Sequence, residues 1–139
     1  MKALVVDDCA VARELLVLAL ENYTEVDQVE SGVDAVKMVE AALDSDSPYD
    51  LICMDLNMPG MTGHDALRLI RQKEADRSSQ HLSKIFMVTA SSSPDDMMEA
   101  LLAGDCDDYL TKPVLMNTLK ELLQKHQIAD PVSLKPSTL

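Results

Sequence analysis

Hydrophobic residues gather in short runs that are separated by longer polar or mixed segments. The runs at residues 3–6, 51–54, 85–89 and 109–111 are almost continuous in apolar residues, and a weaker run at 25–30 contains Val26 and Val29. A run without polar alternation is typical of a strand that is buried on both faces of a parallel sheet. The pattern therefore predicts five strands.

Between these runs, apolar residues recur at spacings of three and four, which puts them on one face of a helix. The predicted faces are Ala12, Leu15, Leu16 and Ala19; Ala35, Met38, Val39 and Ala42; Ala66, Leu69 and Ile70; and Leu115, Leu119 and Leu122. Thr62 is a typical N-cap for the third of these helices, whose polar end at 72–80 should be exposed. A further helix is expected from Ser93 to Gly104.

Five strands alternating with five helices predict an α/β fold in which helices cover both faces of a parallel sheet. In such folds, ligands bind beyond the carboxyl ends of the strands. Residues that follow different strands can therefore meet in one site.

Polar and charged residues stand at these strand ends. Asp7 and Asp8 follow the first strand, Asp55 follows the third, Thr89 ends the fourth and Lys112 follows the fifth. Carboxylates in one pocket repel one another unless a cation lies between them, and oxygen ligands suit Mg²⁺. A magnesium ion beside a lysine and a threonine hydroxyl is suited to a phosphoryl group. Taken alone, Asp55 could be a turn residue. Because the other strand ends carry two acids, a threonine and a lysine, we interpret Asp55 as a nucleophile that forms an aspartyl phosphate.

Composition narrows the class of protein further. The 139 residues suffice for one domain of ordinary size, and the formal charge of -12 disfavours binding to nucleic acid or anionic lipid. The three cysteines form no CxxC pair and indicate reduced thiols, and no run approaches the roughly 18 apolar residues of a membrane span. We expect a cytoplasmic protein that does not insert into membranes.

Four motifs then occur in order: VVDD at 5–8, MDLNMPGMTG at 54–63, VTA at 88–90 and YLTKP at 109–113. Together they resemble the receiver domain of two-component response regulators, and the resemblance covers residues 2–126. It implies a flavodoxin-like, doubly wound sheet with the strand order 2-1-3-4-5. It also implies a cis peptide bond between Lys112 and Pro113.

The resemblance assigns roles to the residues at the strand ends. Asp55 would accept a phosphoryl group from a phosphohistidine, and Lys112 would pair with the carboxylate or the phosphate. Asp8 would bind Mg²⁺ directly, Asp7 mainly through water, and Asn57 through its backbone carbonyl.

The same resemblance implies a switch. Thr89 would move to bond the phosphoryl oxygen, and Tyr109 would change rotamer with it. The signal would reach a partner at the face formed by the fourth helix, the fifth strand and the fifth helix. The donor would be a histidine kinase or a histidine phosphotransfer protein. We expect a receiver domain at 1–126 and a short tail at 127–139 without an output domain.

Two other functions are open to the same residues. A phosphatase of the haloacid dehalogenase type would need a second acid at the position of Asn57, so an enzyme is not expected beyond catalysis of the chain's own phosphorylation and dephosphorylation. The alternative function is that of a degenerate receiver that binds partners without phosphorylation. Whether a phosphorylated chain would act as a final output or as a relay stays open.

Other polar residues are expected to be structural. The histidines His64, His81 and His126 have no ligand spacing and are expected at the surface. Asp107 and Asp108 are expected in a solvated loop before the fifth strand.

Overall fold

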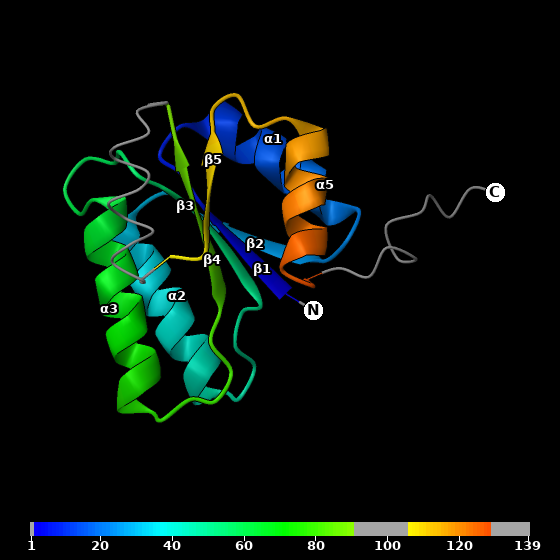
Figure 1. Ribbon diagram of the computed structural model, residues 1–139. Helices are drawn as coiled ribbons and strands as arrows, with labels where there is room; N and C mark the ends of the chain where they lie inside the picture. The colour runs from blue at the N-terminus through cyan, green and yellow to red at the C-terminus, as the bar shows by residue number, and fades with distance from the viewer. Residues whose placement is uncertain (1, 91–105, 129–139) are drawn as a thin grey trace.

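A single parallel sheet organises the computed structural model, which describes residues 2–90 and 106–128. Its strands are β1 (Lys2–Val6), β2 (Glu25–Val29), β3 (Leu51–Asp55), β4 (Lys84–Thr89) and β5 (Asp108–Thr111). They lie in the order β2-β1-β3-β4-β5, and every neighbouring pair is parallel (Figure 1). The predicted fold class and strand order are confirmed.

Helices cover both faces of this sheet. In the described ranges they are α1 (Ala10–Glu21), α2 (Gly32–Asp44), α3 (Gly63–Asp76) and α5 (Met116–Lys125). Figure 1 shows α2 and α3 on one side of the sheet and α1 and α5 on the other. The helix expected from Ser93 to Gly104 lies outside the described residues. None of the helices within these ranges is both long enough and apolar enough to cross a membrane.

The two hydrophobic layers follow from the alternation of side chains along each strand. Leu4, Ile52 and Ile85 point to the layer beneath α2 and α3. Their chain neighbours Val5 and Cys53 point to the layer beneath α1 and α5, where the other members of the core cluster include Phe86, Val88 and Leu119. The three central strands are thus buried on both faces, which explains why their sequences lack polar alternation.

Local sequence signals fix the starts of two helices. The Ser31 hydroxyl accepts a hydrogen bond from the Asp34 amide at the start of α2, and the Thr62 hydroxyl accepts one from the Asp65 amide at the start of α3. The caps satisfy amides that have no partner within the helix. The N-cap expected at Thr62 is therefore present, and the peptide bond between Lys112 and Pro113 is cis, as the resemblance implied.

Several expectations about exposure were wrong. Leu15 is 63% exposed rather than buried on α1, because the buried side of this helix is formed by Leu16, Val17 and Leu20. Glu74 is buried although it belongs to the polar end of α3. Its carboxylate accepts hydrogen bonds from the Arg71 guanidinium (2.7 Å) and the Ser83 amide (2.9 Å), which compensate for its burial.

The acidic pair before the fifth strand is also better connected than expected. Asp107 accepts hydrogen bonds from Arg71 (3.1 Å) and from the Ile85 amide (2.8 Å). Asp108 belongs to β5 and lies 2.9 Å from the His126 ring, which packs on Phe86. His126 is thus largely buried instead of lying at the surface, whereas His64 is half-buried and His81 is exposed.

Candidate functional site

Three carboxylates meet at the carboxyl ends of β1 and β3. One oxygen from each of Asp7, Asp8 and Asp55 lies within 4.8 Å of the others. They meet because β1 pairs directly with β3, so that the chain leaves both strands at the same edge of the sheet. Asp7 and Asp55 are each 4% exposed, whereas Asp8 is open to solvent. The cluster therefore has two buried members and one accessible member.

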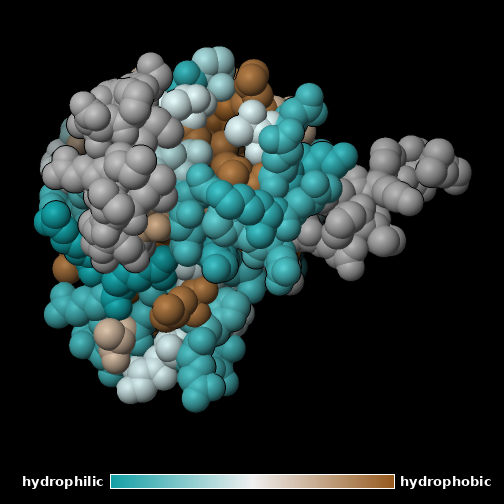
Figure 2. Space-filling model, viewed as in Figure 1, coloured by the Kyte–Doolittle hydropathy of each residue, from teal (hydrophilic) through white to brown (hydrophobic). Residues whose placement is uncertain are grey.

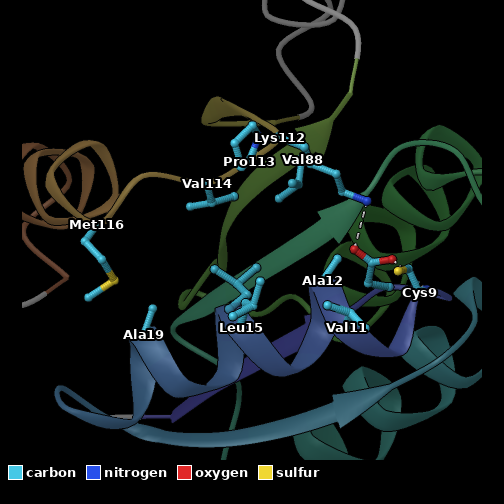
Figure 3. Close-up of a pocket in the computed structure, with 12 residues that line it drawn as sticks. Cys9, Val11, Ala12, Leu15, Ala19, Val88, Lys112, Pro113, Val114 and Met116 are labelled. Carbon is cyan, nitrogen blue, oxygen red and sulfur yellow. Dashed lines mark hydrogen bonds and ion pairs between the residues drawn. The ribbon is translucent and has the colours of Figure 1, made fainter.

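Lys112 is the cation of this cluster. Its ammonium lies 3.0 Å from Asp7 Oδ2, a contact marked by the dashed line that starts at Lys112 in Figure 3. The same ammonium lies 3.4 Å from Asp55 Oδ1. The lysine follows β5, and its backbone amide donates a hydrogen bond to the Thr89 carbonyl (2.8 Å). This backbone bond joins the ends of β4 and β5 and directs the lysine side chain toward the carboxylates.

Burial and charge both perturb the titration of the site. Burial of the Asp55 carboxyl and the neighbouring charge of Asp7 raise the pKa of Asp55 to about 6, while Lys112 and the Asn57 amide act in the opposite direction. Burial alone would lower the pKa of Lys112, but its bond to Asp7 and the charges of both aspartates outweigh burial and raise it. The lysine therefore stays protonated, whereas Asp55 changes its charge near pH 6.

The remaining predicted residues surround this core of charges. The Asn57 amide donates to Asp55 Oδ1 (3.3 Å), and the Asn57 side chain is exposed at the rim. Thr89 is the last residue of β4 and is buried. Tyr109 is buried in β5, on the sheet face that carries α2 and α3. Thr89 and Tyr109 thus stand on the strands that lie beyond Asp55 in the sheet.

A glycine lets the next helix approach the strand that carries Asp55. A Cβ atom on Gly63 would collide with the Asp55 carbonyl oxygen and would lie only 2.9 Å from Leu56 Cα. The Gly63 amide also donates to the Leu56 carbonyl (3.0 Å), which closes the loop between β3 and α3. Glycine at this position therefore keeps the loop close against the site.

An apolar groove of about 520 Å³ opens beside the carboxylates. One wall is formed by α1 and the other by the connection from β5 to α5 (Figure 3). Val11 (69%), Leu15 (63%) and Met116 (50%) are strongly exposed there, and Asp7 and Lys112 line the end of the groove. Figure 2 shows hydrophobic side chains at the upper edge of the molecule, where α1 and the start of α5 lie in Figure 1. The spacing of apolar residues along α1 does not predict this groove, because it places Leu15 in the core.

The donor set of the cluster fits a hard divalent cation. All three groups present carboxylate oxygens, which Mg²⁺ and Ca²⁺ prefer, and sulfur and imidazole ligands are absent from the cluster. Asp8 faces solvent and leaves room for water, which suits Mg²⁺ because this ion usually keeps several water ligands. The residues present therefore fit the magnesium ion that the sequence predicts.

The fold and this acidic site define an α/β domain with a candidate cation site at the carboxyl ends of its strands, and comparison with known proteins gives the family. Residues 3–124 match the response regulator receiver domain family. This chain belongs to that family. Membership of this family, together with the acidic cluster, supports a role as a phosphorylation-activated switch in two-component signal transduction.

Individual relatives agree with this placement. The chain is 35% identical over 127 residues to the chemotaxis protein CheY of Pseudomonas aeruginosa, which covers 90% of this chain and 94% of that protein. Among solved structures it is similar to the CKI1 receiver domain of Arabidopsis thaliana complexed with Mg²⁺ and BeF₃⁻ (29% identity, TM-score 0.77, covering 91% and 89%). It is equally similar to a chain in the co-crystal of Ypd1 with the Ssk1 receiver domain of Saccharomyces cerevisiae (29% identity, TM-score 0.78, covering 97% of each chain).

Proposed function

We propose that this protein is a switch whose Asp55 carboxylate accepts a phosphoryl group from a phosphohistidine. The observation that carries the proposal is the cluster of Asp7, Asp8 and Asp55 oxygens within 4.8 Å, closed on one side by the Lys112 ammonium. A nucleophile, a site for a divalent cation and a fixed positive charge are the groups that phosphoryl transfer requires.

Asp8 and Asp55 would hold Mg²⁺ through their carboxylates, Asp7 mainly through water, and Asn57 through its backbone carbonyl. When bound, the ion neutralises charge on the oxygens of the transferred group. Its double charge also offsets the repulsion among the three carboxylates and favours ionised Asp55. With its pKa raised only to about 6, this carboxylate is mostly ionised at neutral pH even without the ion. Asp55 is therefore ready to act as a nucleophile.

In the transfer step, an Asp55 oxygen forms a bond to phosphorus as the bond between phosphorus and the imidazole nitrogen of the donor breaks. The electron pair of that bond returns to the imidazole, and the product is an acyl phosphate on Asp55. Lys112 lies 3.4 Å from the carboxylate and would pair with the phosphoryl oxygens. Hydrolysis of the acyl phosphate by water would reset the switch, so that the chain catalyses only its own modification.

The signal would travel along β4 and β5. Thr89 would move toward the phosphoryl oxygen, and Tyr109 would change its rotamer in response. Both residues are buried on neighbouring strands, where Tyr109 pairs with Met87, two residues before Thr89, so a movement of Thr89 would change the space open to Tyr109. The target protein would bind at the face that includes β5 and α5.

The groove between α1 and α5 would receive the phosphodonor. A donor must bring its histidine to Asp55, and the groove ends at Asp7 and Lys112, the neighbours of Asp55. Its exposed aliphatic walls suit the apolar side of a helix. The co-crystal of Ypd1 with the Ssk1 receiver domain shows that a receiver similar to this chain associates with a histidine phosphotransfer protein. We expect a histidine kinase or phosphotransfer protein to use this groove.

The chemical stability of the phosphorylated product tests whether the phosphoryl group is held as an acyl phosphate. The protein is incubated with acetyl phosphate in Mg²⁺ or in EDTA, and the phosphorylated product is then treated with hydroxylamine, which cleaves acyl phosphates. We expect phosphorylation only with Mg²⁺ and complete loss of the group in hydroxylamine. A hydroxylamine-stable phosphate would contradict an aspartyl phosphate. A folded protein that gains no phosphoryl group would favour the alternative, a phosphorylation-independent interaction module.

A further inference from the structure

Arg13 joins the acidic loop to two other elements. It lies in the first turn of α1, and its side chain is only 13% exposed. The Nη1 group donates to the Asp7 backbone carbonyl (2.8 Å), and the Nε group donates to Gln28 Oε1 (2.9 Å) on β2. A guanidinium that is mostly buried and bonded to both neighbours restrains the loop between β1 and α1.

The two anchors of this loop lie on either side of Asp8. On the first side, Arg13 binds the Asp7 carbonyl. On the second side, the Cys9 amide donates to Asp7 Oδ1 (2.9 Å). The Asp7 carbonyl and the Asp8 amide belong to one planar peptide unit, so a hydrogen bond that fixes the carbonyl also restrains the Asp8 Cα. The bond from the Cys9 amide restrains the backbone on the other side of Asp8, and together the two bonds limit the directions that the Asp8 side chain can take.

We propose that Arg13 is a positioning residue for the metal site, because it holds the Asp7–Asp8 peptide so that the exposed Asp8 carboxylate stays within reach of Asp7 and Asp55. Arg13 acts through the backbone and touches neither the metal nor the phosphoryl group. The inference rests on the proposed function, since it concerns the same magnesium site.

The charge of Arg13 and its hydrogen bond to the Asp7 carbonyl should change the Mg²⁺ affinity in opposite directions. A positive charge near three carboxylates weakens the binding of a cation, so removal of the Arg13 charge by itself should strengthen Mg²⁺ binding. Loss of the bond to the Asp7 carbonyl should weaken Mg²⁺ binding, because Asp8 then samples orientations that do not face the cluster. The direction of the change therefore shows which effect is larger.

Two features of the contacts provide matched variants. The fork of the guanidinium binds Asp7 and Gln28 through separate nitrogens, and a lysine ammonium on a flexible stem lacks this planar fork. Arg13→Lys thus retains the charge but not the geometry. Glu30 lies 3.5 Å from Arg13 Nη2 and is 75% exposed, so this ion pair should add little. Glu30→Gln is therefore a control that changes the charge near Arg13 without freeing the Asp7 carbonyl.

Isothermal titration of Mg²⁺ into the metal-free protein tests the proposal. Mutation of a residue that holds a metal ligand in place without touching the metal typically lowers metal affinity by about 10-fold to 100-fold. We expect Arg13→Ala to weaken Mg²⁺ binding by about 10-fold, Arg13→Lys to weaken it by a smaller factor, and Glu30→Gln to leave it close to wild type. At saturating Mg²⁺, the rate of phosphorylation by acetyl phosphate should return close to the wild-type rate, because Arg13 does not touch the reacting atoms.

Unchanged or tighter Mg²⁺ binding by Arg13→Ala would overturn the proposal. Thermal unfolding monitors the fold of each variant, and if Arg13→Ala does not fold, Arg13→Lys decides in the same way: wild-type affinity overturns the proposal and weaker binding supports it. A wild-type protein that binds no Mg²⁺ would instead contradict the proposed function itself. The two failures are therefore distinct.

Discussion

The Lys112 ammonium lies 3.0 Å from Asp7 and 3.4 Å from Asp55, so one cation bridges two buried carboxylates at the ends of different strands. In the metal-free protein this contact offsets the repulsion between the two aspartates. A magnesium ion would share these carboxylates with the lysine. The site thus contains two competing sources of positive charge, and their competition can be measured.

Replacement of Lys112 should strengthen the binding of Mg²⁺. Removal of an ammonium 3.0 to 3.4 Å from two candidate ligands removes a repulsion against the incoming ion. We expect Lys112→Ala to bind Mg²⁺ several-fold more tightly in isothermal titration, yet to transmit phosphorylation poorly to a partner, because the phosphoryl oxygens lose their cation. Weaker Mg²⁺ binding by a folded Lys112→Ala variant would contradict this account of the charges. Lys120→Ala, on the exposed side of α5, is the control for net charge.

Asp55 should lower the stability of the metal-free protein at neutral pH. Because the pKa of Asp55 is about 6 in the folded state and about 4 in an unfolded chain, the folded protein binds more protons between these values, and stability falls as pH rises through this window. The shift of about two units corresponds to about 3 kcal/mol, which solvent at the mouth of the site reduces to about 1–2 kcal/mol.

Urea unfolding in EDTA measures this effect. We expect Asp55→Asn to exceed wild type in free energy of unfolding by about 1–2 kcal/mol at pH 7.5, and the difference to shrink toward pH 4. Saturating Mg²⁺ should reduce the difference, since it stabilises the wild-type protein. A difference that does not change with pH would show that the Asp55 carboxylate is not perturbed in the way described.

Gly63 and Gly60 form a matched pair for the loop after Asp55. A Cβ atom on Gly63 would collide with the backbone of Asp55 and Leu56, whereas a Cβ atom on Gly60 would meet nothing within 4 Å. Gly60 has a φ of 78°, so Gly60→Ala should cost about 1 kcal/mol through backbone strain alone. Gly63→Ala should cost at least about 2 kcal/mol, because backbone atoms must shift. Equal costs in urea unfolding would contradict the close approach of α3 to β3.

Substitutions in the apolar groove should slow phosphoryl transfer from a protein donor but not from a small molecule. We expect Leu15→Gln and Met116→Gln to slow transfer from a phosphorylated histidine phosphotransfer protein, such as Ypd1, by about 10-fold through weaker docking. The rate with acetyl phosphate should not change, because this small donor needs no groove. Leu82→Gln replaces a leucine that is 57% exposed elsewhere and serves as the control. Transfer that is slowed equally by all three variants would argue against a docking surface in the groove.

The strands and the residues at their ends could be predicted because both depend on local sequence. Buried central strands require continuous apolar runs, and the parallel arrangement brings their carboxyl ends to one edge of the sheet. The positions of Asp7, Asp8, Asp55 and Lys112 followed from these two facts. The strand order and the cis bond at Pro113 came from the resemblance to receivers, since the periodicity of the sequence contains neither.

The remaining features depend on contacts between distant segments. Glu74 is buried because Arg71 and Ser83 satisfy its carboxylate, and a polar stretch of helix contains no signal of that environment. Leu15 is exposed because the α1 face that contacts the sheet is rotated from the one that simple spacing selects. The sequence does not single out Arg13, because a lone arginine in a first helical turn is common and its partners, the Asp7 carbonyl and the Gln28 side chain, lie elsewhere in the chain.

Intact mass spectrometry shows directly whether Asp55 is the phosphoacceptor. Wild-type protein and Asp55→Asn are incubated with acetyl phosphate and Mg²⁺, and circular dichroism checks that both are folded. We expect the mass of one phosphoryl group to be added to wild type only, and not in EDTA. The same gain of mass in Asp55→Asn would contradict the assignment of Asp55.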